Sequence, residues 1–581
     1  MKRSSSVFDE FGRATQTSQT AGEVSASTTY AQFSAKPVSS AIGYLGTKVG
    51  LSFDANTSRE SARSITATGY SATLSIVHDA QGRISAETLT GVGTRALGYD
   101  DGGHITSQTG WGFSGSGASY GFTAGAKSSE TLPLAYPGAE GWHAEYSYTP
   151  SGRLATASID GASTSYSFDA AGNLDGIKRD SEATTTLAYD PGNRLVSSGT
   201  TDYGWDVAHG WRTSQRRSGE ASVTFAYTGT GRLESYSDPN RSVVASYAYD
   251  ASGQRTASHV VEGARSTDTT WTYDGIELLG LSSRETSGSE ESTWTITYFR
   301  DENGTPFAGV YRASDASDTP FLMVTTDRGD VVELTDASGA PFVAYRYDAF
   351  GNPAAAGPAT RSTLTLTAAL AANIASRQPL RYSGYCYDAE SSTYYLSARQ
   401  YDPTAMQFLT KDPAKADGEE SAYQYAGGDP IGGVDPSGLA VISKLSHLPW
   451  PFPLITGANA TSDAYIHWNY DTNSGRLTVT AWVNITANVQ KGVEIVKVAY
   501  AYIQRKEGDD WIRPSRDYSQ GAAPSGTSTW GWRTVYDSLW LYRYHLYWGI
   551  ARSGGDMSAV SSGQYKDWWV KNPISLTRPK K

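Results

Sequence analysis

Two histidines and an arginine in the last quarter of the chain have side chains that could carry out chemistry: His467, His545 and Arg543. An imidazole can act as a general base, and a guanidinium can bind phosphate, so this set would suit a nuclease. The alternative is that the histidines are partly buried strand residues and the arginine is a solvated cation. The sequence contains no phosphate-binding GKS/T loop, HExxH, cysteine pair or G-x-S-x-G.

Composition excludes several classes of protein. A lone cysteine, Cys386, rules out a disulfide scaffold and a multi-thiolate zinc site, and we predict neither a metal nor a cofactor. No apolar run approaches the roughly 18 residues of a transmembrane helix. No apolar segment follows Met1-Lys-Arg-Ser-Ser-Ser, so a signal peptide is not expected. With 60 glycines, 38 tyrosines and 18% charged residues, the chain favours strands and turns over helices or disorder.

One short pattern recurs along the chain: an aromatic residue, Asp, two variable residues, Gly, a polar residue and an apolar residue. Several copies lie 20 to 22 residues apart, and the pattern is already present at 8–13. The chain therefore begins inside an array, as a short family member or a fragment of a longer protein would. The copies begin at His78, Tyr99, Tyr148, Phe168, Tyr189, Tyr227, Tyr249 and Tyr347.

Each copy predicts a hairpin turn. Asp at the first turn position accepts hydrogen bonds from the turn's amides. Gly at the fourth position lets the backbone leave the turn without steric strain. The aromatic residue ends one strand, and the next begins after the polar residue. Between turns the residues alternate, most clearly at 164–168. One hairpin is unstable alone, so we expect the hairpins to stack into a long antiparallel sheet.

This array resembles the YD repeats of the Rhs, TcC and teneurin families. The resemblance covers about residues 1–439, with degenerate copies at 20–75 and 106–145. It implies an all-β fold in which antiparallel sheet spirals into a hollow shell.

A second segment, 345–439, is similar to the Rhs repeat-associated core domain. Its motifs include Tyr394-Tyr-Leu-Ser-Ala-Arg-Gln-Tyr-Asp-Pro403 and the closing Asp435-Pro-Ser-Gly-Leu439. The resemblance implies domains at 1–344 (shell), 345–439 (core, plugging one end of the shell) and 440–581 (variable C-terminal module).

In many relatives this core is an aspartyl autoprotease that cuts after the final leucine. By that resemblance, Asp412 and Asp435 are the carboxylate pair, Arg399 is a cationic neighbour, and the cut falls between Leu439 and Ala440. The pair would share a proton and act as general base and general acid. Three departures from the relatives that cleave weigh against cleavage. Asp412-Pro-Ala-Lys replaces Asp-Pro-x-Gly, the spacing of 23 between Asp412 and Asp435 is one longer than usual, and an arginine of the family is replaced by a glutamine. The alternative is that both Asp-Pro units are structural turns.

The C-terminal module differs in composition from the rest. Residues 440–581 hold 16 Lys and Arg against 10 Asp and Glu, a net charge of +6, which leaves −17 for residues 1–439. Ten of the 16 tryptophans also lie there. Alternation at 477–485 and aromatic or apolar runs at 493–503 and 539–548 predict a small antiparallel β-domain.

Three functions are compatible with these features. The first is a shell that encapsulates and delivers its own C-terminal module as a bacterial polymorphic toxin. The partners of such a toxin are an immunity protein and a target-cell nucleic acid, envelope component or glycan. The second is a non-enzymatic surface or carbohydrate-binding protein, and the third is an inactive truncated remnant. The resemblance implies that the protein is secreted or lies at the cell surface.

Overall fold

The computed structural model describes residues 42–438, apart from 55–58, 68–69, 137–140, 252, 274–275, 315–317 and 413–420. Outside that range it describes mainly strand backbones. Grouping residues by their contacts gives two compact units: one holds most of the chain up to Lys444, and the other holds most of it from Leu445 onward.

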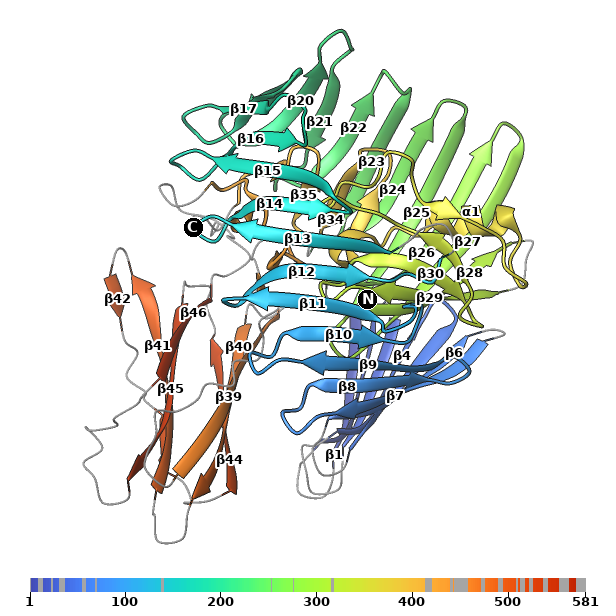
Figure 1. Cartoon of the computed structure of the whole chain (residues 1–581). Helices are drawn as coiled ribbons and strands as arrows, with labels where there is room; N and C mark the ends of the chain where they lie inside the picture. The colour runs from blue at the N-terminus through green and yellow to red at the C-terminus, as the bar shows by residue number, and fades with distance from the viewer. Residues whose placement is uncertain are drawn as a thin grey trace, which may run out of the picture. The chain divides into compact units, whose positions relative to one another are not determined.

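The first unit contains one long antiparallel sheet in which successive strands pair in chain order, as expected for stacked hairpins (Figure 1). Its strands are β1 (Lys2–Phe8), β2 (Ala14–Ala21), β3 (Val24–Tyr30), β4 (Pro37–Tyr44), β5 (Thr47–Phe53), β6 (Glu60–Ala67), β7 (Tyr70–His78), β8 (Ile84–Leu89), β9 (Gly93–Tyr99), β10 (Ile105–Thr109), β11 (Ala118–Thr123), β12 (Ala126–Leu132), β13 (Trp142–Tyr148), β14 (Leu154–Ile159), β15 (Ala162–Phe168), β16 (Leu174–Arg179), β17 (Thr185–Tyr189), β18 (Leu195–Ser198), β19 (Thr201–Asp206), β20 (Trp211–Arg217), β21 (Val223–Tyr227), β22 (Leu233–Asp238), β23 (Val243–Tyr249), β24 (Arg255–Glu262), β25 (Arg265–Asp274), β26 (Glu277–Ser287), β27 (Glu290–Arg300), β28 (Pro306–Ala313), β29 (Thr319–Thr325), β30 (Val331–Asp336), β31 (Pro341–Ala344) and β32 (Ala359–Thr360).

The repeated turn has the predicted geometry. At the β7–β8 turn, the amide of Gly82 donates to the Asp79 carbonyl over 2.9 Å, and Asp79 Oδ1 accepts the amide of Arg83 over 2.9 Å. Gly82 has φ +85°, a left-handed conformation that favours glycine. The aromatic residue ends its strand and the next strand begins six residues later, as β7 and β8 show. The turn prediction is therefore confirmed.

The repeat tyrosines have an additional function that the pattern did not reveal. The hydroxyls of Tyr189, Tyr227 and Tyr249 donate to main-chain carbonyls 15 or 16 residues earlier, over 2.6 to 2.7 Å. Each acceptor lies at the start of the preceding, paired strand. A phenylalanine would pack in the same place without this bond, so the hydrogen bond gives a physical reason for tyrosine at these positions.

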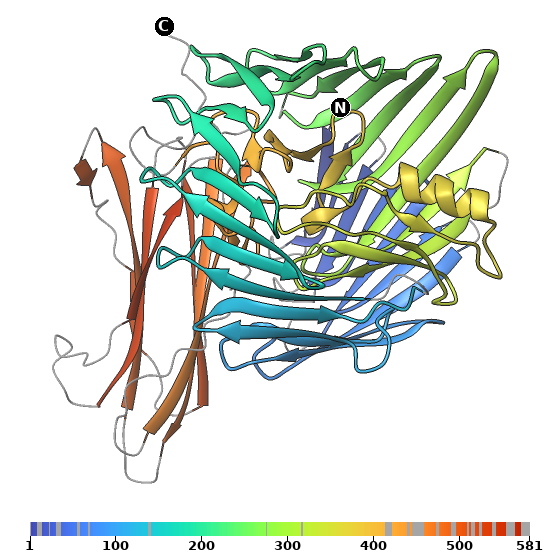
Figure 2. The same ribbon diagram turned by 45° about the horizontal axis from the view of Figure 1, so that its top comes forward.

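The core segment lies against the concave side of this sheet (Figure 2). Phe350, Met406 and Ile431 pack against β13–β17, and Leu409 packs against β21–β23. The elements of the segment are α1 (Ala368–Arg377), η1 (Tyr382–Gly384), β33 (Cys386–Asp388), β34 (Thr393–Leu396), β35 (Arg399–Asp402), β36 (Gln407–Phe408), η2 (Tyr425–Gly428) and β37 (Gly433–Val434). Just after the segment, β38 (Ile442–Ser443) pairs with β37.

Helix α1 was not expected from the sequence. Thr367 caps its N-terminus by accepting the amide of Leu370 over 3.2 Å, and Ala371, Ile374 and Ala375 are its buried residues. No helix in the described part of the chain is long and apolar enough to cross a membrane.

The second unit contains two antiparallel sheets, one of β39, β40 and β44 and one of β41, β42, β43, β45 and β46. Its strands are β39 (Ala458–Asp471), β40 (Arg476–Val489), β41 (Ile495–Glu507), β42 (Asp510–Ile512), β43 (Tyr518–Gly521), β44 (Gly526–Tyr536), β45 (Tyr542–Arg552) and β46 (Gln564–Val570). The all-β prediction is confirmed, whereas the domain boundaries at 344/345 and 439/440 stay predictions.

Candidate functional site

The three predicted core residues lie together. Arg399 begins β35, Asp412 follows β36, and Asp435 follows β37. One nitrogen of Arg399, Nη2, lies 3.5 Å from Asp412 Oδ2 and 3.4 Å from Asp435 Oδ2. The two carboxylate oxygens are therefore at most 6.9 Å apart. All three side chains are buried, so a pair of carboxylates and one cation occupies a largely dry site.

Arg399 also contacts the main chain next to the predicted cut. Its Nε donates to the carbonyl of Gly438, and its Nη1 donates to the carbonyl of Ala422 over 3.2 Å. The guanidinium lies 3.6 Å from the centre of the Phe408 ring. Burial lowers the pKa of Arg399, and the charges of the two aspartates oppose that shift. Arg399 thus joins both carboxylates to the residue that precedes Leu439.

A turn of the sheet holds the segment after β36 that carries Asp412. The backbone of Trp211 pairs with that of Thr410, and the amide of Lys411 donates to the Gly210 carbonyl over 3.1 Å. The amide of Asp412 donates to the Ala422 carbonyl over 3.0 Å. The β19–β20 turn therefore positions one of the two carboxylates.

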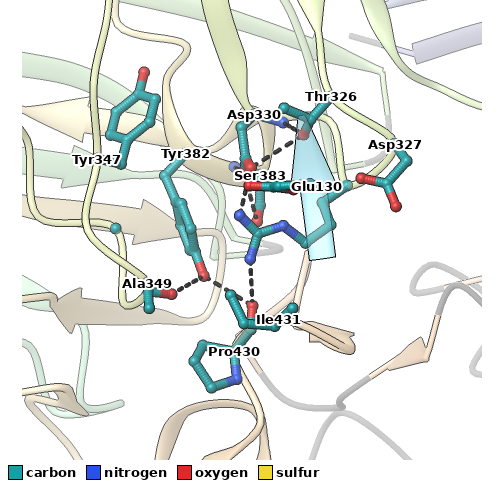
Figure 3. Close-up of polar contacts among 12 residues, drawn as sticks. Glu130, Thr326, Asp327, Asp330, Tyr347, Ala349, Tyr382, Ser383, Pro430 and Ile431 are labelled. Carbon is teal, nitrogen blue, oxygen red and sulfur yellow. Dashed lines mark hydrogen bonds and ion pairs between the residues drawn. The ribbon is translucent and has the colours of Figure 1, made fainter. Parts of the chain in front are cut away.

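The segment that carries Asp435 is fixed further upstream at Pro430. Figure 3 shows the hydroxyl of Tyr382 between two carbonyls, those of Ala349 at 3.1 Å and Pro430 at 3.0 Å. Arg328 Nη1 donates to the same Pro430 carbonyl over 2.8 Å, and its Nη2 donates to Asp330 over 2.6 Å. These residues could not be predicted from the sequence, because no local sequence pattern links positions about 100 residues apart.

The sheet and the core are also joined by buried ion pairs. Arg255 Nη1 lies 2.7 Å from Asp388 Oδ2, and Arg212 Nη2 lies 2.5 Å from Asp402 Oδ2. Arg255 has no exposed surface, and its guanidinium lies 4.2 Å from the ring centre of Tyr395. These contacts anchor the core strands β33 and β35 to the sheet strands β24 and β20.

The remaining predicted positions are not brought together by the described structure. His467 lies in β39, whereas Arg543 and His545 lie in β45, which belongs to the other sheet. The description of these strands covers their backbones alone. Leu439 and Ala440 lie outside the described residues. Within the described residues, no group of three His, Cys, Asp or Glu side chains could hold a metal ion.

Several known proteins are similar to this chain. It is 28% identical over 294 residues to the tRNA3(Ser)-specific nuclease WapA of Bacillus spizizenii, covering 48% of this chain and 11% of that protein. It is 28% identical over 321 residues to the double-stranded DNA deaminase toxin A of Burkholderia cenocepacia, covering 51% of this chain and 21% of that protein. The matched part thus spans about a tenth to a fifth of these relatives.

A solved structure and a family of sequences also match. The crystal structure of TcdB2-TccC3-TEV has a TM-score of 0.36 and 16% identity, covering 75% of this chain and 27% of that one. The sequence model of the teneurin YD-shell matches residues 138–431, which are 294 of the 581 residues. With half of its length matched, the chain belongs to the teneurin YD-shell family.

Proposed function

We propose that this chain is a toxin shell that cleaves itself after Leu439 and releases residues 440–581 as an effector. The observation that carries the proposal is the contact of Arg399 with Asp412, Asp435 and the Gly438 carbonyl. A buried carboxylate pair beside a specific stretch of its own chain suits a single-turnover reaction governed by position.

In this mechanism one carboxylate of the pair is protonated and the other is ionised. The ionised member, acting as general base, takes a proton from water while the water oxygen bonds to the carbonyl carbon of Leu439. The protonated member gives its proton to the nitrogen of Ala440 as the carbon–nitrogen bond breaks, which leaves a new carboxyl end and a new amino end. Arg399 holds the adjacent Gly438 carbonyl, next to the bond that breaks.

The nature of the cargo is supported by the relatives and by charge. Two relatives are named as a tRNA nuclease and a DNA deaminase toxin, so a nucleic acid is the proposed target of the released module. Its net charge of +6 suits a polyanion, and the net charge of −17 on residues 1–439 suits a shell that encloses a basic cargo. Delivery to a neighbouring cell would require that the protein be secreted or lie at the cell surface, and protection of the producer would require an immunity protein.

Expression in a bacterial cytoplasm tests this function with three chains: the full sequence, the Asp435→Asn variant and a chain ending at Leu439. We expect growth arrest with the full sequence, a weaker effect with the variant, and normal growth with the shortened chain. Equal growth of all three would refute the effector. If glycan binding accompanied that normal growth, it would support a surface-binding protein instead.

A further inference from the structure

Residues 430–438, which carry Asp435, are held at both ends by arginines. Arg328 donates to the Pro430 carbonyl over 2.8 Å, and Arg399 donates to the Gly438 carbonyl. Seven residues lie between these two anchor points, so the position of the carboxylate among them depends on contacts made in the middle of the segment.

A tyrosine hydroxyl makes the central contact. The amide of Asp435 donates to Tyr385 Oη over 2.7 Å, and Tyr385 Oη lies 3.0 Å from Tyr425 Oη. Tyr385 is 5% exposed and Asp435 is 1% exposed. Burial, the main cause, raises the pKa of Tyr385, so the hydroxyl stays neutral at physiological pH. A neutral hydroxyl can accept the amide and still donate its own proton to Tyr425.

Packing alone does not fix this part of the segment. A cavity of about 260 Å³ is lined by Val434 and Pro436, the two neighbours of Asp435, and also by Tyr385 and Cys386. Val434 and Pro436, which flank Asp435, line the cavity, whereas Asp435 itself contacts Arg399 and does not line it, so the cavity leaves space beside the flanking backbone. Without the hydroxyl, that backbone has room to shift toward the cavity.

We propose that Tyr385 is a positioning residue for the self-cleavage: its hydroxyl, oriented by Tyr425, holds the Asp435 backbone so that the carboxylate stays beside Arg399 and Asp412. The inference rests on the proposed function. Tyr385 contributes no proton to the reaction and acts through the geometry of the carboxylate pair.

A matched pair of variants tests this role. Tyr385→Phe removes the acceptor of the Asp435 amide. Tyr394→Phe is the control, because Tyr394 lies in the same buried tyrosine cluster and donates to the Gly351 carbonyl over 2.7 Å, away from Asp435. Each change removes one buried hydroxyl and keeps the ring. The full chain is made by cell-free synthesis, and cleavage is followed over time on denaturing gels between pH 4 and pH 9. Thermal unfolding is measured separately on chains that also carry Asp435→Asn, so that they remain uncleaved.

We expect Tyr385→Phe to slow cleavage between about 10-fold and 100-fold, as misplacement of a reacting group does. We also expect it to alter the pH range of activity, because the pH profile reports the acid and base that act together, and the substitution changes how they are placed. Tyr394→Phe should lower the unfolding temperature similarly while leaving the cleavage rate and pH range unchanged. If both variants cleave alike, Tyr385 has no positioning role. If the unmodified chain stays intact, the proposed self-cleavage itself fails.

Discussion

Arg399 lies 3.4 Å from the carboxylate of Asp435, and it binds the carbonyl of Gly438 three residues further along the same turn. One side chain therefore fixes both a reacting group and the chain next to the bond that the group would attack. In the proposed self-cleavage, this arrangement would let a buried carboxylate act on its own backbone without a separate substrate-binding site.

Replacing Arg399 with lysine separates charge from geometry. Lysine keeps a positive charge but, as a single ammonium group, cannot reach both carboxylates and the Gly438 and Ala422 carbonyls together. We expect Arg399→Lys to slow self-cleavage by about 10-fold or more. Gel analysis of freshly synthesised chains measures the rate. Unchanged cleavage would show that the charge alone is sufficient.

Gly210 connects the sheet to the segment that carries Asp412. It has φ +72°, and a Cβ there would lie 2.6 Å from Tyr423 Oη and 3.2 Å from Lys411 Cβ. Gly210→Ala should lower the free energy of unfolding by ~1–3 kcal/mol and slow cleavage, because the collision displaces the segment that carries Asp412.

Gly219→Ala is the matched control for that change. Gly219 has φ +83°, but a Cβ there meets nothing within 4 Å. Gly219→Ala therefore introduces backbone strain without a collision. Denaturant unfolding and the cleavage time course are measured on both variants. If Gly219→Ala impairs cleavage as much as Gly210→Ala does, the collision at position 210 does not affect the site.

The sequence predicted the repeated hairpins of this fold well, but it did not predict the contacts between residues far apart in the chain. The Asp79 to Gly82 turn follows from the residues themselves, because each partner lies within four positions. Helix α1 also left a signal, since Thr367 precedes an alanine-rich run with high helix propensity. Tyr385 could not be predicted as a partner of Asp435, because only the folded core brings positions 50 residues apart into contact.

The Arg255–Asp388 pair should be essential for folding of the core onto the sheet. Arg255→Met leaves the Asp388 carboxylate buried without its arginine, which typically costs about 3–5 kcal/mol. Arg216→Met is the control, because Arg216 and Asp202 are both more than half exposed and 3.9 Å apart. Urea unfolding should show a large loss for the first variant and almost none for the second. Equal stability of the two variants would argue against this anchor.

Glu333 should make stability depend on pH. It is fully buried in β30, its Oε2 accepts the amide of Tyr136 over 2.8 Å, and burial raises its pKa to about 8. Because the pKa of Glu333 is higher in the folded chain than its unfolded value of 4.5, the folded state holds the proton more tightly than the unfolded state does. The contribution of Glu333 to the free energy of unfolding is therefore fully present below pH 4.5 and is lost as the pH rises through 8. Between pH 5 and pH 8 the loss is up to about 4 kcal/mol. Glu333→Gln should remove this part of the slope in urea unfolding, and a slope unchanged by the substitution would contradict the assignment.

The most direct test of self-cleavage is intact-mass analysis of the full chain beside its Asp435→Asn variant, both made under identical conditions. We expect the unmodified chain to yield a fragment of 142 residues beginning at Ala440, residues 440–581 of the sequence, and the variant to remain uncut. A folded, unmodified chain that keeps its full mass, or a variant that cleaves at the same bond, would contradict it.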